Sequence, residues 1–563
     1  MRRILLVGGL MLGSACAPHR DANKDWDAFR DRFIEGILRD QPGFAVAQGR
    51  HEYDGKLRDV SEAGLTHSAA FLKAARDTAL AFDPTTLDST RRFERDYLAA
   101  VVDGQLFWQV SADGPHKNPD WYTGELDPQV YLTRPYAPLA DRLKAYIAWA
   151  KAIPTATASI QANLHPPLAR PIIDIGRIRF GGLADYLTND VPQVFADVKD
   201  TALQAQFRDA NGAAAKAFTA LDMWLEAQRK TQTEDFALGA AKFAEMLQAT
   251  ERVDVPLDTL MALGRADLAR NVAALKDACA QFAPGKSIPD CVKKEAAHKP
   301  EGGPVAEGRR QLVMLEAFVR SKDIVSIPDT QHAQVMPSPP YQQSNSAFID
   351  IPGPYEKGMP SVYYISPPNP KWTKAEQEGY IPGVADLLFT SVHEVWPGHF
   401  LQFLHANHSP SMLGRLFVGY AYAEGWAHYC EEMMWEEGLG NGDPETHVGQ
   451  LINATLRDAR FISAIGMHSG KMTTAESEKL FHDEAFQDAA TSREQAERGT
   501  YDPAYLNYTL GKLMIRKLRD DWTATRGGKT AWKAFHDAFL QYGGPPIPLV
   551  RQAMLGNKAG PAL

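Results

Sequence analysis

A histidine–glutamate pair followed closely by a second histidine is the part of the chain whose residue types most clearly suggest chemistry. The stretch runs from His393 and Glu394 to His399. Neutral imidazoles bind zinc through nitrogen, and a carboxylate next to such a ligand can take a proton from metal-activated water. Zinc hydrolases usually space this motif as His-Glu-x-x-His, which places both histidines on one helix face. These residues therefore predict a zinc hydrolase site.

The second histidine comes two positions later than that spacing requires. In an undistorted helix, His393 and His399 would point about 120° apart. Pro397 lies between them, lacks an N–H, and places its ring against the carbonyl of His393, four residues back. Gly398 then permits backbone angles that other residues resist. We expect a helix break here that returns His399 to the side of His393.

Glu424 is the expected third ligand. Apolar residues at helical spacing predict two helices joined by a short turn at residues 409–411, and such helices bring His399 and Glu424 face to face. The two predicted helices span residues 385–406 and 412–437. His428, one turn after Glu424 on the same face, is the alternative ligand. Glu431 is placed to orient a ligating histidine from behind.

These motifs resemble the signature of a known bacterial family. His-Glu-x-x-Pro-Gly-His followed by Glu-Gly-Trp-Ala-x-Tyr is similar to the pattern of the family called domain of unknown function 885. The resemblance runs from about residue 25 to about residue 545 and includes residues 42–61, 466–473 and 503–511. Two departures occur: Met472 stands where the family has tryptophan, and 503–511 lack its Gly-Gln pair.

The resemblance implies a fold related to helical zinc peptidases of the thimet oligopeptidase and carboxypeptidase Taq types. The expected fold is mainly α: a large, helical, zincin-like body with a small β segment flanking a deep active-site cleft. By the same resemblance, His468 and Tyr508 would donate hydrogen bonds to the oxyanion that forms at an attacked peptide carbonyl. Arg460 would bind a substrate carboxylate with both ends of its guanidinium group; the alternative is an internal ion pair.

The expected reaction is hydrolysis assisted by Zn²⁺. A zinc ion held by His393, His399 and Glu424 would lower the pKa of a bound water. Glu394 would take the proton of that water and pass it to the leaving amine.

Prolines divide the chain into regions. Residues 24–325 have apolar residues at helical spacing between prolines, which predicts a helical N-terminal region. Residues 326–375 are too rich in proline for a helix and form a predicted β segment. Residues 376–563 are predicted to be a helical zinc-binding region that carries catalysis.

Two short runs in the proline-rich segment are predicted to be edge strands. They are Ala347–Ile351 and Ser361–Ile365. An edge strand can pair with an extended peptide, in which case Tyr363 and Tyr364 would line the cleft and contact substrate. The alternative is a structural flap whose tyrosines belong to the core.

The N-terminus predicts export. Residues 1–15 combine a basic start, a short apolar run and small residues before Cys16, which indicates a signal peptide with lipidation of Cys16. Ordinary secretion is the alternative, because Gly13 stands where leucine is typical of lipoproteins. The expected location is the periplasm or the cell envelope, with membrane contact only through the lipid.

Export also makes a disulfide possible. Cys279 and Cys291 flank a short loop that contains Pro284, Gly285 and Pro289, so a bridge between two helix ends is predicted. Two free thiols are the alternative. Cys430 is expected to be a buried free thiol.

Composition narrows the function further. The chain has 563 residues and a net charge of −9, which argues against nucleic acid as a partner because nucleic acid requires a basic face. We therefore predict an exported zinc metallopeptidase of short peptides. The alternatives are a zinc-stabilised envelope binding protein without turnover and a zinc hydrolase of non-peptide amides. Glu394 favours an enzyme, since a purely structural zinc site needs no general base.

Overall fold

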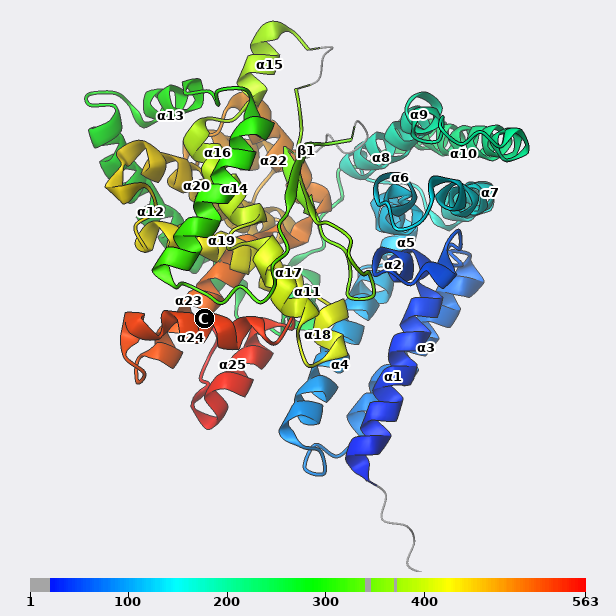
Figure 1. Cartoon of the computed structure of the whole chain (residues 1–563), viewed down its shortest axis with the longest axis horizontal. Coiled ribbons are helices and arrows are strands. Elements are labelled where there is room, and N and C mark those ends of the chain that lie inside the picture. The colour runs from blue at the N-terminus through cyan, green and yellow to red at the C-terminus, as the bar shows by residue number, and fades with distance from the viewer. Residues whose placement is uncertain (1–20, 340–345, 369–371) are drawn as a thin grey trace, which may run out of the picture.

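The computed structural model describes residues 21–339, 346–368 and 372–563. These residues are mainly helical, and a small three-stranded sheet interrupts the helices in the middle of the chain (Figure 1). The predicted signal segment and Cys16 lie outside the described residues. Among the residues that are described, no helix is both long and apolar enough to cross a membrane.

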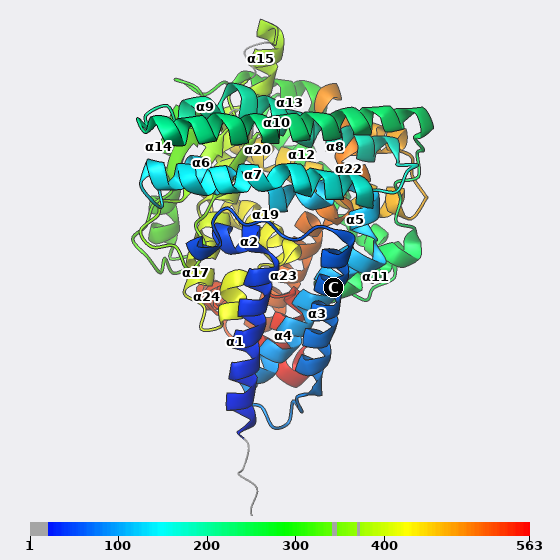
Figure 2. The same cartoon turned by 90° about the vertical axis from the view of Figure 1, so that its right-hand side faces the viewer.

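The first ten helices form one lobe, which we call the N-terminal lobe. Its long helices α7, α8 and α10 pack side by side, and the antiparallel group of α1, α3 and α4 extends below them (Figures 1 and 2). Short polar side chains cap several of these helices; Asp21, for example, accepts hydrogen bonds from the first backbone N–H groups of α1. The bounds are α1 Ala22–Asp40, α2 Pro42–Ala47, α3 Glu62–Ala81, α4 Ser89–Leu106, α5 Gly114–Lys117, α6 Gln129–Thr133, α7 Leu139–Asn163, α8 Arg170–Asn189, α9 Val191–Val194 and α10 Thr201–Gln228.

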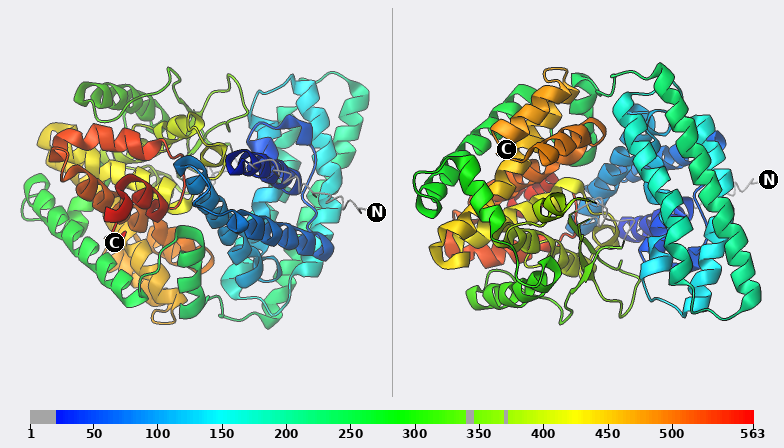
Figure 3. Two further views of the ribbon diagram at one scale, coloured as in Figure 1. Left: turned by 90° about the horizontal axis from the view of Figure 1, so that it is seen from below. Right: turned by 90° about the horizontal axis from the view of Figure 1, so that it is seen from above.

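The remaining helices form the C-terminal lobe around the largest apolar core. Figure 3 shows the two lobes side by side. They meet where α4 packs against α11, α18 and α25 and where α8 packs against α22. The bounds are α11 Ala240–Glu251, α12 Leu257–Phe282, α13 Ile288–Ala297, α14 Pro304–Lys322, α15 Lys374–Tyr380, α16 Val384–Glu394, α17 His399–Asn407, α18 Met412–Leu416, α19 Tyr420–Glu436, α20 Pro444–His468, α21 Thr474–Asp483, α22 Ala489–Tyr501, α23 Asn507–Thr523, α24 Trp532–Leu540 and α25 Ile547–Leu555.

The division between the lobes differs from the division by composition. The apolar core of the C-terminal lobe includes Phe243, Leu260 and Leu315, which belong to the predicted N-terminal region of residues 24–325. Helix α12 lies along α20 in particular. Helices of both lobes have the same apolar spacing, so the sequence contains no signal for the boundary between α10 and α11.

The proline-rich segment contains a sheet with strand order β1-β3-β2. Strand β1 is parallel to β3, and β2 is antiparallel to β3. The prediction that the second run is an edge strand is therefore wrong, because β3 lies in the centre of the sheet. The sequence pattern did not predict β1, which pairs with the other side of β3. Its Pro337 is tolerated because β1 is an edge strand. The bounds are β1 Gln334–Pro337, β2 Ala347–Asp350 and β3 Val362–Ile365.

The predicted disulfide is confirmed. Cys279, near the end of α12, is bonded to Cys291 in α13, and their Cα atoms lie 5.7 Å apart. Cys430 is a buried free thiol, as expected. The bridge therefore fixes α13 to the end of the long helix that packs along α20.

Buried charges tie together the helices of the C-terminal lobe. Lys512 on α23 is completely buried, and its ammonium group contacts Asp267 on α12, Glu432 on α19 and Asp458 on α20. Removing one partner from such a buried cluster of ion pairs strongly destabilises the folded protein. The cluster thus holds α12, α19, α20 and α23 in one arrangement, and three of these helices carry predicted site residues.

Candidate metal centre

The predicted helix break is present between the two histidines. Helix α16 ends one residue after His393, and α17 begins at His399. The carbonyl of Pro397, freed by the break, accepts a hydrogen bond of 2.9 Å from the indole N–H of Trp426 on α19. A side chain at Gly398 would collide with the carbonyl oxygen of His393. Glycine is therefore required here by a close approach of two backbone segments rather than by an unusual φ angle, which is −71°.

The break brings the three predicted ligands to one point. The Nε2 atom of His393 lies 3.1 Å from a carboxylate oxygen of Glu424, and Nε2 of His399 lies 3.4 Å from the same oxygen. One ligand atom from each residue lies within 4.8 Å of the other two. The imidazole rings are 4.7 Å apart and nearly perpendicular. The site thus offers two imidazole nitrogens and a carboxylate, a donor set that zinc takes in hydrolases.

Two glycines explain how Glu424 reaches this point alongside Tyr508. Gly425 on α19 and Gly511 on α23 face each other so closely that a Cβ on either would collide with the opposite backbone. The absence of side chains lets the two helices approach, and this brings Tyr508 on α23 near the ligands. Its ring is 6.0 Å from the ring of His393.

A buried carboxylate orients His393 from behind. Glu431 is fully buried, accepts a hydrogen bond of 2.7 Å from Nδ1 of His393, and pairs with Arg457 at 3.1 Å. Burial alone would raise the pKa of Glu431, but Arg457, His428 and His393 outweigh it and hold that pKa well below its usual range. Glu431 therefore fixes the tautomer that leaves Nε2 of His393 available as a ligand.

The electrostatics of His393 reflect the same two carboxylates. Burial lowers its pKa, but hydrogen bonds to Glu424 and Glu431 outweigh burial and raise the pKa to about 9. Two carboxylates around one imidazole create the strongly negative environment that a divalent cation neutralises.

The alternative ligand, His428, does not belong to this group. It is completely buried, and its Nδ1 lies 3.2 Å from Glu431, on the far side of that carboxylate. Burial foremost, with the nearby Lys512, lowers its pKa to about 3, so the ring is neutral. Of the two histidines, His399 is the one that completes the set with His393.

Glu394 lies beside the donor set rather than in it. It is half-buried, and its carboxylate forms no hydrogen bond or ion pair with any described residue. Burial foremost, with a smaller contribution from Glu424, raises its pKa above the ordinary value. The structure thus supplies a carboxylate that is free to accept a proton next to the predicted ligands.

Tyr508 is available as a hydrogen-bond donor. Its hydroxyl has no hydrogen-bond partner among the described residues, and it is not fully shielded from solvent. Burial and the Glu424 carboxylate raise its pKa, so the hydroxyl keeps its proton. This placement suits the role predicted for it.

His468 does not have the role predicted for it. Its Nδ1 accepts a hydrogen bond of 3.2 Å from the backbone N–H of Leu238, and its Nε2 donates to the carbonyl of Gly499 at 2.8 Å. Burial lowers its pKa to about 4. Both ring nitrogens are therefore engaged, and His468 ties α20 to two neighbouring segments instead of offering a donor to an oxyanion.

The two tyrosines of β3 also differ from prediction. Tyr363 is completely buried, with its hydroxyl 3.5 Å from that of Ser391 on α16. Tyr364 points to the other side of the sheet, where it is buried against Phe348. Neither tyrosine is exposed to a substrate, because β3 is the central strand and both of its faces are covered. The alternative of a structural flap with core tyrosines describes them.

A comparison with known families identifies the chain. A family model described as bacterial protein of unknown function (DUF885) matches residues 42–554. The chain belongs to this family. No functionally curated protein shows significant similarity to it.

Two solved structures are similar to this DUF885 member over nearly their full lengths. A putative lipoprotein of unknown function from Shewanella oneidensis is 26% identical, with a TM-score of 0.78 over 94% of this chain and 99% of its own. A putative lipoprotein from Colwellia psychrerythraea is 16% identical, with a TM-score of 0.80 over 95% and 99%. Both share the fold.

Sequence reasoning missed three residues around the site. Trp426 supports the helix break, and Arg457 balances the charge of Glu431. Tyr420, one turn before Glu424 on α19, holds its hydroxyl between Arg498 and Asp502. Only Tyr420 could have been found from spacing, because it shares a helix face with a predicted ligand.

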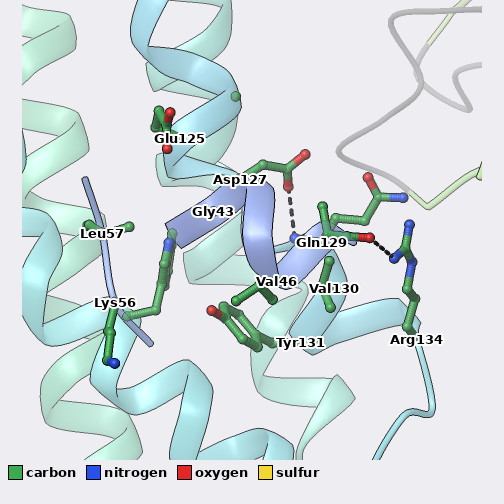
Figure 4. A pocket seen from close by; sticks show the side chains of 13 residues that line it. Gly43, Val46, Lys56, Leu57, Glu125, Asp127, Gln129, Val130, Tyr131 and Arg134 are labelled. Carbon is green, nitrogen blue, oxygen red and sulfur yellow. Dashed lines mark hydrogen bonds between the residues drawn. The ribbon is translucent and has the colours of Figure 1, made fainter. Parts of the chain in front are cut away.

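A separate pocket of about 120 Å³ lies in the N-terminal lobe (Figure 4). Its walls include Glu125, Asp127, Tyr131 and Arg134. Burial raises the pKa of Glu125 to about 7 and that of Asp127 to about 6. None of the predicted ligands or catalytic residues lines this pocket, so it is independent of the candidate metal centre.

Proposed function

We propose that this DUF885 member is an exported, zinc-dependent metallopeptidase that hydrolyses short peptides. The observation that carries the proposal is the meeting of His393, His399 and Glu424, with the unpaired carboxylate of Glu394 next to them. Three protein ligands and a neighbouring base are typical of a catalytic zinc site, whereas structural zinc sites are usually closed by four protein ligands.

The residues divide the work as follows. Zinc bound to the three ligands would polarise the substrate carbonyl and lower the pKa of water. Glu394 takes a proton from the attacking water and passes it to the leaving amine, which is general acid–base catalysis by one carboxylate. The free hydroxyl of Tyr508 donates to the oxyanion that develops at the carbonyl. Glu431, which is itself paired with Arg457, keeps His393 in place and in one tautomer.

The position of β2 supports a peptide as the substrate. Among the described residues β2 pairs on one side only, with β3, and it lies against α16, the helix that carries His393 and Glu394. An extended peptide can pair with such an edge and present its backbone to the adjacent site. The substrate would then lie in a cleft between the three-stranded sheet and the helices of the C-terminal lobe.

Export is supported by the N-terminal pattern before Cys16 and by the two similar structures, which are described as putative lipoproteins. A lipid on Cys16 would anchor the enzyme to the cell envelope.

The substitution Glu394→Gln tests the proposal. Glutamine keeps the size of the side chain but cannot accept a proton, so peptide turnover should fall by about 10²–10⁴-fold while zinc stays bound. The measurement is digestion of a mixed peptide library by zinc-loaded wild type and variant, with zinc content determined on the same samples. Equal turnover in both proteins would refute the role of Glu394. Zinc bound without peptide turnover in wild type would favour a binding protein or a hydrolase of other amides.

A further inference from the structure

Arg460 on α20 is a buried arginine that forms no ion pair with the carboxylate of any described residue; Glu494 on α22 interacts with its charge only at longer range. Its side chain is nearly enclosed, with the residue 8% exposed, and its Nε donates a hydrogen bond of 2.7 Å to the side-chain oxygen of Gln495 on α22. Every other buried arginine of the described chain contacts a carboxylate. These are Arg58, Arg134, Arg457, Arg519 and Arg551.

The surroundings of Arg460 make its lone charge unfavourable. Burial foremost, with the neighbouring Arg498 and Arg457, lowers the pKa of Arg460. A buried cation without an ion-pair partner is unfavourable, because desolvation is not offset by an opposite charge. An anionic ligand would relieve this, so the arrangement is poised for a carboxylate that arrives from outside the chain.

The terminal nitrogens of Arg460 are available to such a ligand. They form no hydrogen bond with any described residue, and neither nitrogen is fully shielded from solvent. Gln495 holds the Nε edge, which leaves the two terminal nitrogens for a bidentate contact. The internal ion pair considered from the sequence is absent among the described residues.

Arg460 lies close enough to the candidate metal centre to act on the same substrate. Its guanidinium carbon is 4.9 Å from the centre of the Tyr508 ring, which in turn is 6.0 Å from the ring of His393. The guanidinium group is thus separated from His393 by no more than these two distances together, the length of about three residues of extended chain. The ring of Tyr508 is near both groups, so the anion site and the predicted ligands share this neighbour.

We propose that Arg460 binds the free C-terminal carboxylate of the peptide, and that the enzyme therefore removes about one to three residues from the C-terminus. This inference rests on the proposed peptidase function and adds a substrate class to it. The reaction is plain hydrolysis: the C–N bond breaks, the water oxygen bonds to the carbonyl carbon, and the water proton passes to the leaving amine. Every unmodified peptide carries the required carboxylate.

Matched peptides test the inference on the zinc-loaded full chain. One series has a free C-terminal carboxylate and no acidic side chains, a second is the same with a C-terminal amide, and a third is amidated but contains aspartate or glutamate. Products are identified by mass spectrometry. We expect cleavage near the C-terminus of the first series, with kcat/KM about 10- to 100-fold lower for both amidated series, as for the loss of a charge-assisted contact.

Variants of Arg460 separate recognition from structure. Arg460→Gln should reduce kcat/KM for free-acid peptides to the level of the amides, mainly through KM, and leave the amides unchanged. Arg460→Lys should restore part of the preference, because it keeps the charge but not the bidentate fork. Arg265→Gln is the matched control, since Arg265 pairs with Glu484 on the surface.

The outcomes are distinguishable. If wild type cleaves free-acid and amidated peptides equally, or cuts along their whole length, the role of Arg460 is overturned while the peptidase proposal stands. Equal cleavage of the amidated acidic peptides would assign Arg460 to side-chain recognition and also overturn it. If zinc-loaded wild type cleaves none of the three series, the proposed function itself fails. The comparison of peptides on wild type decides the question even if Arg460→Gln does not fold.

Discussion

Replacing Glu431 with glutamine removes the charge that organises the candidate site from behind. Three donors surround this carboxylate: Nδ1 of His393 at 2.7 Å, Nδ1 of His428 at 3.2 Å and the guanidinium group of Arg457 at 3.1 Å. Glutamine is nearly isosteric but has one oxygen and one N–H₂ group. At least one of the three donors would then face another donor, and Arg457 would be left as a buried unpaired cation.

The expected loss follows from burial. Glu431 is fully buried, and removing one partner of a buried ion pair destabilises by about 3–5 kcal/mol. That is a large fraction of the roughly 5–15 kcal/mol by which folded domains are stable. Residues that orient a metal ligand from behind change metal affinity by about 10–100-fold when mutated, so zinc binding should weaken by that factor.

Two measurements check this prediction. Urea unfolding of metal-free protein gives the loss of stability, and competition with a chromophoric chelator gives the zinc affinity. Glu484→Gln is the control, because its partner Arg265 is on the surface and such pairs contribute about 0–1 kcal/mol. A Glu431→Gln protein with wild-type stability and zinc affinity would show that this carboxylate does not organise the site.

Two further predictions concern stability. Replacing Cys279 and Cys291 with serine should lower the free energy of unfolding by only about 2–3 kcal/mol, because the bridge closes a short loop. Urea unfolding measures this loss. Unchanged stability would mean that the bridge contributes nothing. Burial lowers the pKa of His51, but Asp54 and Glu356 outweigh it and raise the pKa to about 9. The stability that this charged contact contributes is complete below about pH 6.5, the pKa of histidine in the unfolded chain, and is lost as the pH rises through about 9. Allowing for solvent screening, we expect the free energy of unfolding to fall by about 1–2 kcal/mol over this range, and His51→Gln should abolish that fall. A His51→Gln variant with the same pH profile as wild type would contradict the prediction.

The helix break and the disulfide could be predicted because their signals are local. Pro397 and Gly398 within an apolar helix pattern are compatible with few structures other than a helix break. Two cysteines on either side of a short loop are likewise compatible with few arrangements other than a disulfide or two free thiols. The meeting of His393, His399 and Glu424 was predicted from their spacing on two helices joined by a turn, and it holds although the second predicted helix, 412–437, is divided into α18 and α19. Such features depend on chain geometry within one segment.

The errors concern residues whose role depends on distant partners. His468 is engaged by Leu238 and Gly499, and no sequence spacing indicates either contact. Tyr363 and Tyr364 were expected to line the cleft, because the sequence did not show that β3 is the central strand and that both of its faces are covered. Strand β1 is short and contains Pro337, so its pairing with β3 could be seen only in the fold. Sequence spacing also does not show that Arg460 forms no ion pair with a described residue.

Zinc content is the most direct test of whether this site is a metal centre. We expect close to one zinc per chain in wild-type protein purified without chelator, and a sharp loss in Glu424→Gln, since Glu424 lies next to both ligating imidazoles. Glu436→Gln, the same change on the same helix at the partly exposed partner of Arg519, should keep its zinc. Full zinc occupancy in Glu424→Gln, or no zinc in wild type after loading, would contradict the proposed centre.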